Sequence, residues 1–256
     1  MSHDDLLSHA EAGVLTLTFN RLDKKNSITA AMYAALADAL AAARDDAAVR
    51  AVVIQGHELI FSAGNDLADF LNDPPASADA PVWRFLHGLR SFPKPLVAGV
   101  CGAAVGIGTT LLLHCDLVYA GDNAKFSLPF VNLGLCPEAA SSLLLPARLG
   151  HVRAAEALLL GEPFGAEQAA EWGLVNRILP PGEVNSFAQA QARRLADKPQ
   201  SALVATKRLM KAASADAVAT AMAAEGEVFG PLLRGPAARE AFSAFMDKRK
   251  PDFSKV

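Results

Sequence analysis

Two glycine-bearing turns in this chain have the residue types and spacing to stabilise negative charge on an oxygen atom. They are Phe61–Leu67 and Gly102–Gly108, and each follows a predicted strand and precedes a predicted helix. Such turns leave backbone N–H groups unpaired at a helix start, where the helix dipole also favours negative charge. Two of them converging on one carbonyl oxygen would make an oxyanion hole. Taken singly, each turn is also explained by the use of glycine in tight packing.

A third segment, Leu135–Ser142, carries a carboxylate suited to proton transfer. Pro137 favours the first position of a helix, so we expect Glu138 in the first helical turn. A first-turn glutamate often serves only to complement the helix dipole. The small and apolar neighbours of Glu138 instead indicate a sheltered carboxylate. Apolar surroundings would raise its affinity for a proton and a helix N-terminus would lower it, and the sequence leaves that balance open.

Other chemistries lack their signatures. Ser62 is not in a Gly-x-Ser-x-Gly turn, so a serine hydrolase is not indicated. His114 and Cys115 are adjacent on a predicted helix and diverge, so we expect no metal site. We interpret His114 as a residue that is packed or capped locally.

The elements that position these segments indicate α/β organisation. Alternation predicts a strand over Val14–Phe19, and Thr29 is placed to cap a helix with its apolar face on Met32, Leu36, Leu40 and Ala43. We expect further strands at Ala51–Ile54, Leu96–Val100 and Asp116–Ala120, helices at Asp66–Leu71 and Ile107–Cys115, and a flexible connection over Asn72–Pro81. Strand signals vanish from about Glu183. We therefore divide the chain into a core, 1–197, and a helical C-terminal region, 198–256.

Composition narrows the class of protein. The 256 residues are 52% hydrophobic and 20% charged, as in an ordinary globular protein, and the net charge of −3 argues against a nucleic-acid partner. No apolar run reaches membrane-spanning length, and the acidic start, Met1–Asp5, is unlike a targeting peptide. Three cysteines do not indicate a secreted disulfide framework. We expect a cytoplasmic protein without a membrane partner.

Several motifs in order carry a resemblance that covers nearly the whole chain. The chain resembles the enoyl-CoA hydratase/isomerase (crotonase) superfamily at Phe61–Leu67, Lys94–Ala98, Gly102–Gly106, Cys115–Ala120, Gly161–Phe164, Ala166–Ala170 and Gly173–Val175. The resemblance implies a spiral of ββα turns with a helical C-terminal region that assembles trimers. It also implies an acyl-CoA thioester as substrate. Coenzyme A is then part of the substrate, and no separate cofactor is expected.

The resemblance also assigns roles to residues. The backbone N–H groups of Asn65 and Ile107 would form the oxyanion hole, so side-chain identity matters little there. The loop residues Ala63, Gly64, Asp66 and Leu67, together with Asn65 and Gly106, would border the substrate. Lys25, beside Lys24, lies where the family often places a basic residue near coenzyme A. A solvated charged loop explains the two lysines as well.

The family resemblance also bears on the reaction. Hydratases of the family use two glutamates, and alignment on Cys115 and Asp116 places Thr110 and Phe130 at those positions. Neither side chain replaces a carboxylate as a base near neutral pH. The segments around Asn65, Ile107 and Glu138 instead resemble the peroxisomal type of Δ3,Δ2-enoyl-CoA isomerase, whose single catalytic glutamate matches Glu138.

The isomerase is the leading hypothesis, in which one carboxylate removes a proton from C2 and returns one to C4 while the oxyanion hole holds the dienolate. Another hydratase or lyase reaction with Glu138 as sole base, and a non-catalytic acyl-CoA-binding protein, stay open. We also expect a homotrimer, or a pair of stacked trimers. The reason is a thin tail with many apolar residues: Leu203, Met210, Met222, Phe229, Phe242, Phe245 and Met246.

Overall fold

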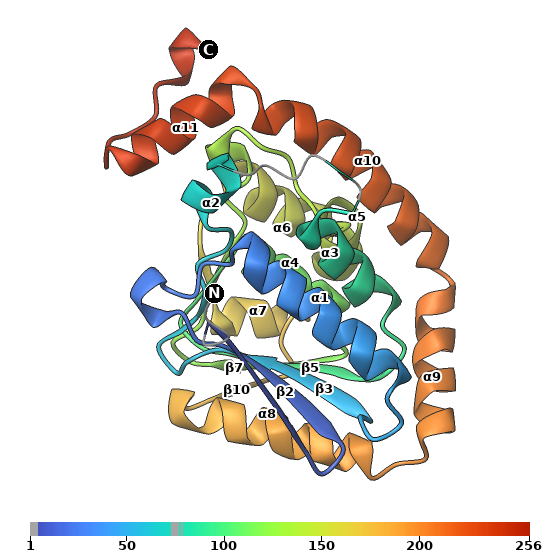
Figure 1. Ribbon diagram of the computed structural model, residues 1–256. Helices are drawn as coiled ribbons and strands as arrows, with labels where there is room; N and C mark the ends of the chain where they lie inside the picture. Colours follow the sequence, from blue (N-terminus) through green and yellow to red (C-terminus); the bar gives the residue numbers. More distant parts are fainter. Residues whose placement is uncertain (1–4, 73–76, 78) are drawn as a thin grey trace.

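The computed structural model describes residues 5–72, 77 and 79–256 and contains two β-sheets surrounded by helices (Figure 1). The larger sheet has the strand order β1-β2-β3-β5-β7-β10, with an antiparallel β1–β2 hairpin and parallel pairing elsewhere. Its strands are β1 (Leu6–Glu11), β2 (Val14–Phe19), β3 (Ala51–Gln55), β5 (Leu96–Val100), β7 (Leu117–Gly121) and β10 (Arg177–Leu179). The predicted strands therefore all belong to one sheet.

The smaller sheet has the order β4-β6-β8-β9. Its strands are β4 (Ile60–Ser62), β6 (Ala103–Val105), β8 (Lys125–Ser127) and β9 (Phe164–Gly165). Along the chain, β3, β5 and β7 of the larger sheet are followed in turn by β4, β6 and β8 of the smaller one. Each repeat thus adds one strand to each sheet, which confirms the expected spiral of ββα turns.

Helices cover both faces of the larger sheet. One face is covered by α8 (Pro181–Ala196), as Figure 1 shows. Its small residues Ala188 and Ala192 belong to one buried cluster with Val53 and Val97 of the sheet. On the other face lie α1 (Ala30–Asp45) and α3 (Pro81–Ser91). Thr29 caps α1 as predicted, because its side chain accepts a hydrogen bond from the Met32 amide. These layers bury every residue of the central strands β3 and β5, whereas the edge strand β1 stays largely exposed.

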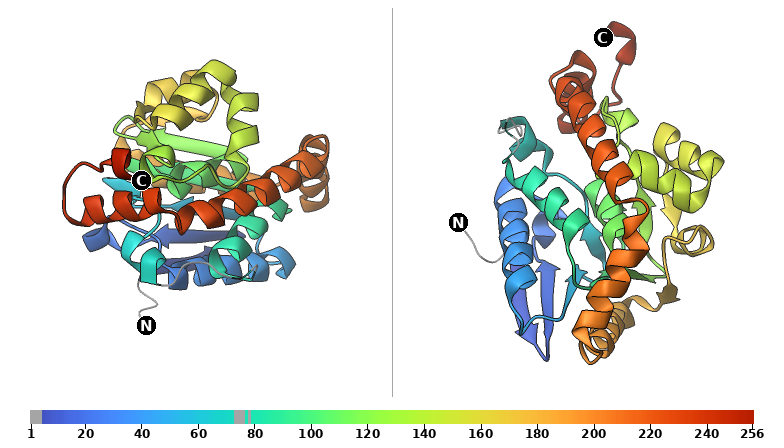
Figure 2. Two further views of the ribbon diagram at one scale, coloured as in Figure 1. Left: turned by 90° about the horizontal axis from the view of Figure 1, so that it is seen from above. Right: turned by 90° about the vertical axis from the view of Figure 1, so that its right-hand side faces the viewer.

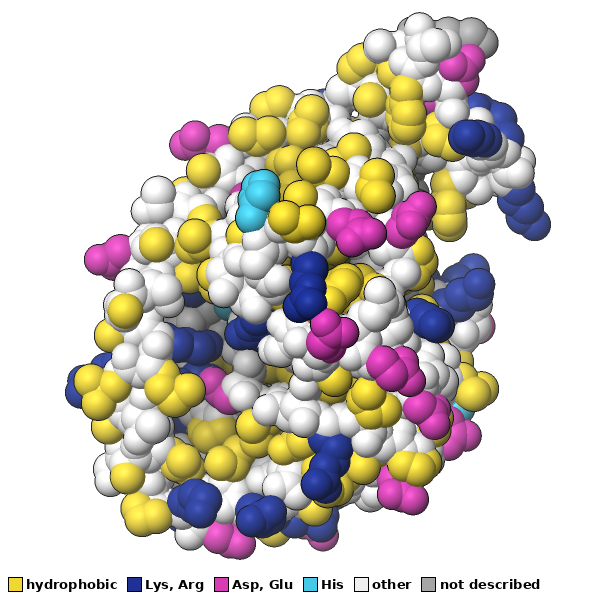
Figure 3. Space-filling view, turned by 180° about the vertical axis from the view of Figure 1, so that it is seen from behind, with side chains coloured by type: hydrophobic (Ala, Val, Ile, Leu, Met, Phe, Trp, Pro, Cys, Tyr) yellow, Lys and Arg dark blue, Asp and Glu magenta, His cyan; other side chains and the backbone are white. Residues whose placement is uncertain are grey.

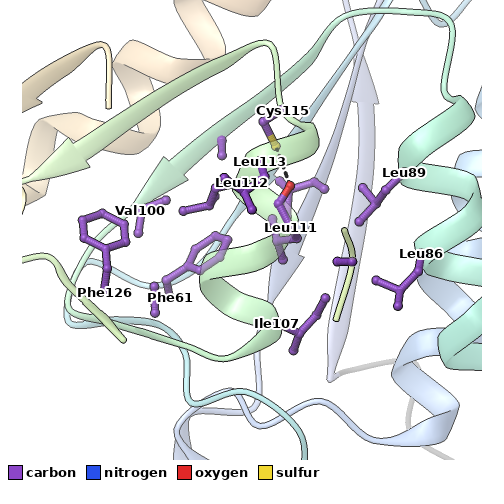
Figure 4. Close-up of a cluster of buried hydrophobic side chains, with 14 of the residues drawn as sticks. Phe61, Leu86, Leu89, Val100, Ile107, Leu111, Leu112, Leu113, Cys115 and Phe126 are labelled. Atoms are coloured by element: carbon purple, nitrogen blue, oxygen red, sulfur yellow. Dashed lines mark hydrogen bonds between the residues drawn. The ribbon is translucent and has the colours of Figure 1, made fainter. Parts of the chain in front are cut away.

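The core around the second glycine turn is densely apolar. Figure 4 shows Leu111, Leu112 and Leu113 between Phe126 of the smaller sheet and Leu89 of α3. The predicted helix here is shorter than expected: α4 covers Ile107–Thr110 and a 3-10 turn covers Leu111–His114. The buried Ile107 side chain therefore anchors the start of this turn in the core.

Two other helices differ from the predictions made from the sequence. The helix expected at Asp66–Leu71 is α2 (Leu67–Asn72), and α3 was not predicted although Pro81 stands at its start. Half of the connection expected over Asn72–Pro81 lies outside the described residues, and its two end residues belong to α2 and α3. The remaining helices are α5 (Ser141–Leu149), α6 (His151–Ala155), α7 (Ala166–Glu171), α9 (Gln200–Ala212), α10 (Ala215–Leu233) and α11 (Pro236–Met246), with short turns at Leu22–Lys24, Val131–Leu133, Glu156–Leu160 and Phe253–Lys255.

The chain after Asp197 is helical, as expected, and its helices lie along one side of the molecule (Figure 2). Lys207 of α9 pairs with Asp116 of the core at 2.7 Å, and the Phe229 ring of α10 contacts the Trp83 ring of α3. The division of the chain at residue 197 stays a prediction. Within the described part of the chain, no helix is long and apolar enough to cross a membrane.

Candidate active site

The first glycine turn is held in place by a segment that precedes α1. The Asn26 side chain donates to the Phe61 carbonyl, and the Ser62 hydroxyl donates to the Asn26 carbonyl. Ser62 Oγ in turn accepts from the Gly64 amide at 3.1 Å, and the Ile28 amide donates to the Gly64 carbonyl at 2.8 Å. These bonds occupy the groups on both sides of Asn65. The turn is therefore fixed without using the Asn65 amide.

The hydrogen bonds of the second glycine turn likewise do not use the backbone amide of Ile107. The Gly106 amide donates to the Ser127 carbonyl, and the amides of Thr109 and Thr110 donate to the Gly106 carbonyl. Among the hydrogen bonds of the described residues, none is donated by the backbone N–H of Asn65 or Ile107. Two free amides of this kind are the donors that an oxyanion hole requires.

Both turns line one cavity of about 750 Å³, here called the loop cavity. It contains all the residues expected at the substrate or in the oxyanion hole except Glu138: Lys25, Ala63, Gly64, Asn65, Asp66, Leu67, Gly106 and Ile107. Arg21 and Lys24 lie on its wall as well, and the rest of the lining is largely apolar, with Phe130, Phe229, Phe242, Phe245 and Met246. The cavity thus offers cations for phosphate groups and an apolar wall for a flexible chain.

Asp66 lines the loop cavity, but its carboxylate is engaged inside the protein. Arg21 donates to it at 2.6 Å and the Ser27 hydroxyl at 3.1 Å. Burial raises the pKa of Asp66, yet the hydrogen bonds from Arg21, the Asp69 amide and Ser27 outweigh burial and hold the pKa below its usual value. Asp66 therefore stays ionised and shapes the loop through this ion pair.

Glu138 lies beside the loop cavity, on the wall of a neighbouring cavity of about 540 Å³, here called the glutamate cavity. Trp83, Leu86 and Met222 also line it, and Phe229 lines both cavities. Phe229 is therefore the residue at which the two cavities meet.

Glu138 is not in the first turn of a helix, so that prediction was wrong. The helix α5 begins at Ser141, and the residues between, Ala139 and Ala140, both adopt left-handed backbone conformations with φ of 59° and 57°. The segment Leu135–Glu138 is irregular. A helix dipole therefore does not determine the proton affinity of Glu138.

Burial dominates the electrostatics of Glu138 instead. Its side chain is buried, which raises the pKa of Glu138 to about 7; the hydrogen bond from Thr110 opposes this increase, and the charge of Glu225 adds to it. The Thr110 hydroxyl donates to Oε1 at 2.5 Å. A carboxylate with a pKa near neutrality can both accept and return a proton.

Four residues that the sequence did not assign to the site surround Glu138 and Asn65. The Tyr33 hydroxyl, fully buried, donates to Asn65 Oδ1. Thr110 contacts Glu138, His114 Nε2 contacts the Ala139 carbonyl at 2.8 Å, and Glu225 contacts the turn that follows. Burial lowers the pKa of His114 to about 4, so the ring is neutral and donates from Nε2. The family alignment singled out Thr110 only as a missing hydratase glutamate. No local motif assigns Tyr33, His114 or Glu225 to the site, because their roles depend on contacts between distant segments.

With this geometry established, the comparison with known proteins identifies the class. A family model for enoyl-CoA hydratase/isomerase matches residues 9–255. The solved structure of Pseudomonas aeruginosa OdaA superposes with a TM-score of 0.93 at 52% identity, covering 95% of this chain and 99% of that one. The chain belongs to the enoyl-CoA hydratase/isomerase family and has its fold.

Curated relatives within the family carry different activities in their names. The chain is 37% identical to 1,2-epoxyphenylacetyl-CoA isomerase of Escherichia coli, over 97% of this chain and 98% of that protein. It is 39% identical to enoyl-CoA delta isomerase 2 of Rattus norvegicus over 80% of this chain, which spans 54% of that longer protein. Other relatives above 30% identity are named hydratases. Membership therefore fixes the class of enzyme, and the reaction must be argued from the site.

Proposed function

We propose that the protein is a Δ3,Δ2-enoyl-CoA isomerase, which moves the double bond of a 3-enoyl-CoA to the 2-trans position. The observation that carries the proposal is a buried carboxylate, Glu138, whose pKa is raised to about 7 chiefly by burial, close to a cavity lined by two backbone amides that donate no hydrogen bond among the described residues. Coenzyme A is part of the substrate in this proposal, and no separate cofactor takes part.

The reaction needs only these groups. Glu138 removes a proton from C2, and the negative charge moves to the thioester oxygen between the amides of Asn65 and Ile107. The resulting dienolate spans C2 to C4. Protonated Glu138 then returns the proton to C4, which leaves a C2–C3 double bond and restores the carboxylate. Atoms and charge balance without water or a second base.

The two positions where family hydratases have glutamates support isomerisation over hydration. Thr110 donates a hydrogen bond to Glu138, and Phe130 is buried on the wall of the loop cavity. Neither side chain can activate water as a carboxylate does. Water addition therefore lacks the two glutamates that hydratases of the family use.

The direct test supplies 3-enoyl-CoA and 2-enoyl-CoA thioesters separately. We expect the first to convert to the conjugated product, followed by ultraviolet absorbance, and the second to show slow hydration or none, followed by mass spectrometry. Rapid hydration comparable to isomerisation would favour a hydratase with Glu138 as sole base. Binding without any turnover would favour an acyl-CoA-binding protein. Either outcome contradicts the proposal.

We also propose that the chain forms a homotrimer, or a pair of stacked trimers. Part of the original reason was wrong, because Met222, Phe229 and Phe242 are buried within their own chain. Four other apolar side chains of the C-terminal helices are 60–76% exposed: Leu209, Met210, Phe245 and Met246. Figure 3 shows exposed apolar side chains among charged ones and the C-terminal segment projecting beyond the main body.

Closed cyclic assembly would cover these exposed side chains. We expect light scattering at micromolar concentration to give three or six times the mass of one chain. A stable monomer under those conditions would contradict the proposal. The cytoplasmic location expected from the composition likewise stays a prediction.

A further inference from the structure

A carboxylate from the C-terminal helix α10 holds the turn that follows Glu138. The Glu225 side chain is buried and accepts three hydrogen bonds from this turn. The Ala140 amide donates to Oε2 at 2.6 Å, and the Ser142 amide and hydroxyl donate to Oε1 at 2.9 and 2.5 Å. Both oxygens of Glu225 are thus directed at two residues of one short segment.

The backbone conformation of this turn requires stabilising contacts from other segments. Ala139 and Ala140 both have positive φ, a conformation that residues with a Cβ adopt rarely and in functional turns. The helix α5 also starts without a side-chain cap from its own N-cap residue, Ala140. Glu225 supplies the missing cap from a helix that lies more than 80 residues later in the sequence.

Two further contacts fix the same turn from other elements. His114 Nε2 donates to the Ala139 carbonyl at 2.8 Å, and the Ser141 hydroxyl donates to the Glu138 carbonyl at 2.6 Å. Glu225 is the one carboxylate among these supports, since the buried His114 ring is neutral and Ser141 contributes a hydroxyl. Hydrogen bonds from main-chain N–H groups to a carboxylate are charge-assisted and stronger than those between neutral groups.

We propose that Glu225 is a positioning residue for Glu138, acting through the main chain of Ala140 and Ser142. The contact places α10, in the C-terminal region, inside the machinery of the active site. This role explains why α10 carries a buried carboxylate that takes part in none of the ion pairs among the described residues. The cations of those pairs are Arg21, Arg84, Arg153, Arg193, Lys207 and Arg249. The reaction on which we would measure the effect rests on the proposed function.

The same arrangement has an electrostatic consequence. Burial is the main cause of the raised pKa of Glu138, and the negative charge of Glu225 raises it further. The other titratable groups near Glu138 are Tyr33 of α1, His87 of α3, His114 of the 3-10 turn and Cys136 of its own loop, with Lys211 and Arg148 acting on His114. Glu227 of α10 and Arg234 at the end of that helix also line the glutamate cavity. Removing the charge of Glu225 should therefore lower the pKa of Glu138.

The test compares Glu225→Gln with Glu225→Asp and with Asp216→Asn, a matched loss of an exposed carboxylate on α10. In Glu225→Gln an amide NH₂ faces a main-chain N–H donor, so we expect kcat to fall about 10-fold or more with KM within about twofold. The acidic limb of the kcat/KM profile should move to lower pH. Glu225→Asp keeps the charge and should recover part of kcat, and Asp216→Asn should match wild type.

A milder variant guards against misfolding. Ser142→Ala removes one donor to Glu225 and leaves both carboxylates in place. We expect a loss in kcat of about threefold without a shift of the acidic limb. If Glu225→Gln keeps wild-type kcat and an unmoved limb, the positioning role is refuted. If Glu225→Gln does not fold, wild-type kcat in both Ser142→Ala and Glu225→Asp refutes it.

A measurement that needs no turnover separates this proposal from the proposed function. Carbon-13 NMR can follow the carboxyl carbon of Glu138, assigned by its disappearance in Glu138→Gln. We expect a titration midpoint of about 7 in the wild type and a lower one in Glu225→Gln. A protein that fails to isomerise 3-enoyl-CoA yet shows this shift would overturn the reaction and retain the role of Glu225. If the protein isomerises 3-enoyl-CoA but Glu225→Gln shows no shift of the midpoint and an unchanged kcat, the role of Glu225 is overturned and the proposed reaction is retained.

Discussion

Replacing Glu138 with glutamine is expected to lower the turnover of 3-enoyl-CoA by about 100-fold or more. Glutamine has nearly the same shape and can still accept the hydrogen bond from Thr110, so the cavity should keep its form. Glutamine lacks a basic carboxylate oxygen, so the side chain can no longer take the proton from C2 and return it to C4. Acyl-CoA binding, measured by calorimetry, should stay close to wild type, because the loop cavity that would hold the thioester and coenzyme A does not include Glu138.

Glu162→Gln gives the control for a lost carboxylate, since Glu162 is exposed on a loop away from both cavities. It should retain full turnover and full binding. A Glu138→Gln protein that turns over within a few-fold of wild type would show that another group moves the proton. The rival carboxylate would then be Glu225, which also lines the glutamate cavity.

The pH dependence of the wild type gives the same experiment a second readout. Glu138 acts as a base only when ionised, and its pKa is raised to about 7, with burial as the main cause. We therefore expect kcat/KM to rise with pH until about 7 and then to level off. The free energy of unfolding should change with pH in the opposite direction. Because the pKa of Glu138 is higher in the folded state than its ordinary value of 4.5, its contribution to stability is fully present below pH 4.5 and is lost as the pH rises through 7. Glu138→Gln should remove both trends.

The fold could be predicted from the sequence where local patterns and core packing agree. Val14–Phe19 alternates and forms β2 over those same residues, and Thr29 caps α1. The helix α3 had a readable pattern, with Val82, Phe85, Leu86 and Leu89 buried at helical spacing after Pro81. It was missed because the segment before it is rich in proline and alanine and was interpreted as a long connection.

The site could be predicted only in part, because its decisive contacts join distant segments. The two glycine turns were found from local spacing, and the structure places them on one cavity. The prediction that Glu138 lies in a first helical turn was wrong. Pro137 favours a helix start, but α5 begins only at Ser141, after two residues with left-handed backbone conformations. Those conformations are supported by His114 and Glu225, and nothing near Glu138 in the sequence signals either residue.

The side chain of Asn65 contributes to stability, whereas its backbone amide is the group proposed to act in catalysis. The sequence predicts that Asn65→Ala costs little in catalysis, because the amide N–H stays in place. In the structure Asn65 Oδ1 accepts a hydrogen bond from the buried Tyr33 hydroxyl. Removing the acceptor leaves that hydroxyl unpaired, which costs about 1–3 kcal/mol of stability. We therefore expect Asn65→Ala to lower the melting temperature more than it lowers kcat.

The two glycines beside the oxyanion amides are required for different reasons. Gly106 has φ of 55° and ψ of −117°, a region that residues with a Cβ avoid, although a Cβ there would meet nothing within 4 Å. Gly64 has φ of 87°, and a Cβ there would lie 2.8 Å from the Val105 carbonyl oxygen. Val105 directly precedes Gly106 and Ile107. A side chain at position 64 would therefore push the two amide-bearing turns apart.

Gly64→Ala is accordingly expected to reduce kcat by about 100-fold to 1,000-fold, the effect of losing one oxyanion-hole donor. The obstacle is backbone, so it cannot be relieved by rotating a side chain, and a shift of a few tenths of an ångström misdirects both amides at once. Gly88→Ala is the matched control: it lies on α3, where a Cβ would meet only Leu40 at 3.8 Å. Stopped-flow assays should show Gly88→Ala at wild-type rate. If a folded Gly64→Ala protein also keeps that rate, the dienolate oxygen is stabilised somewhere other than between Asn65 and Ile107.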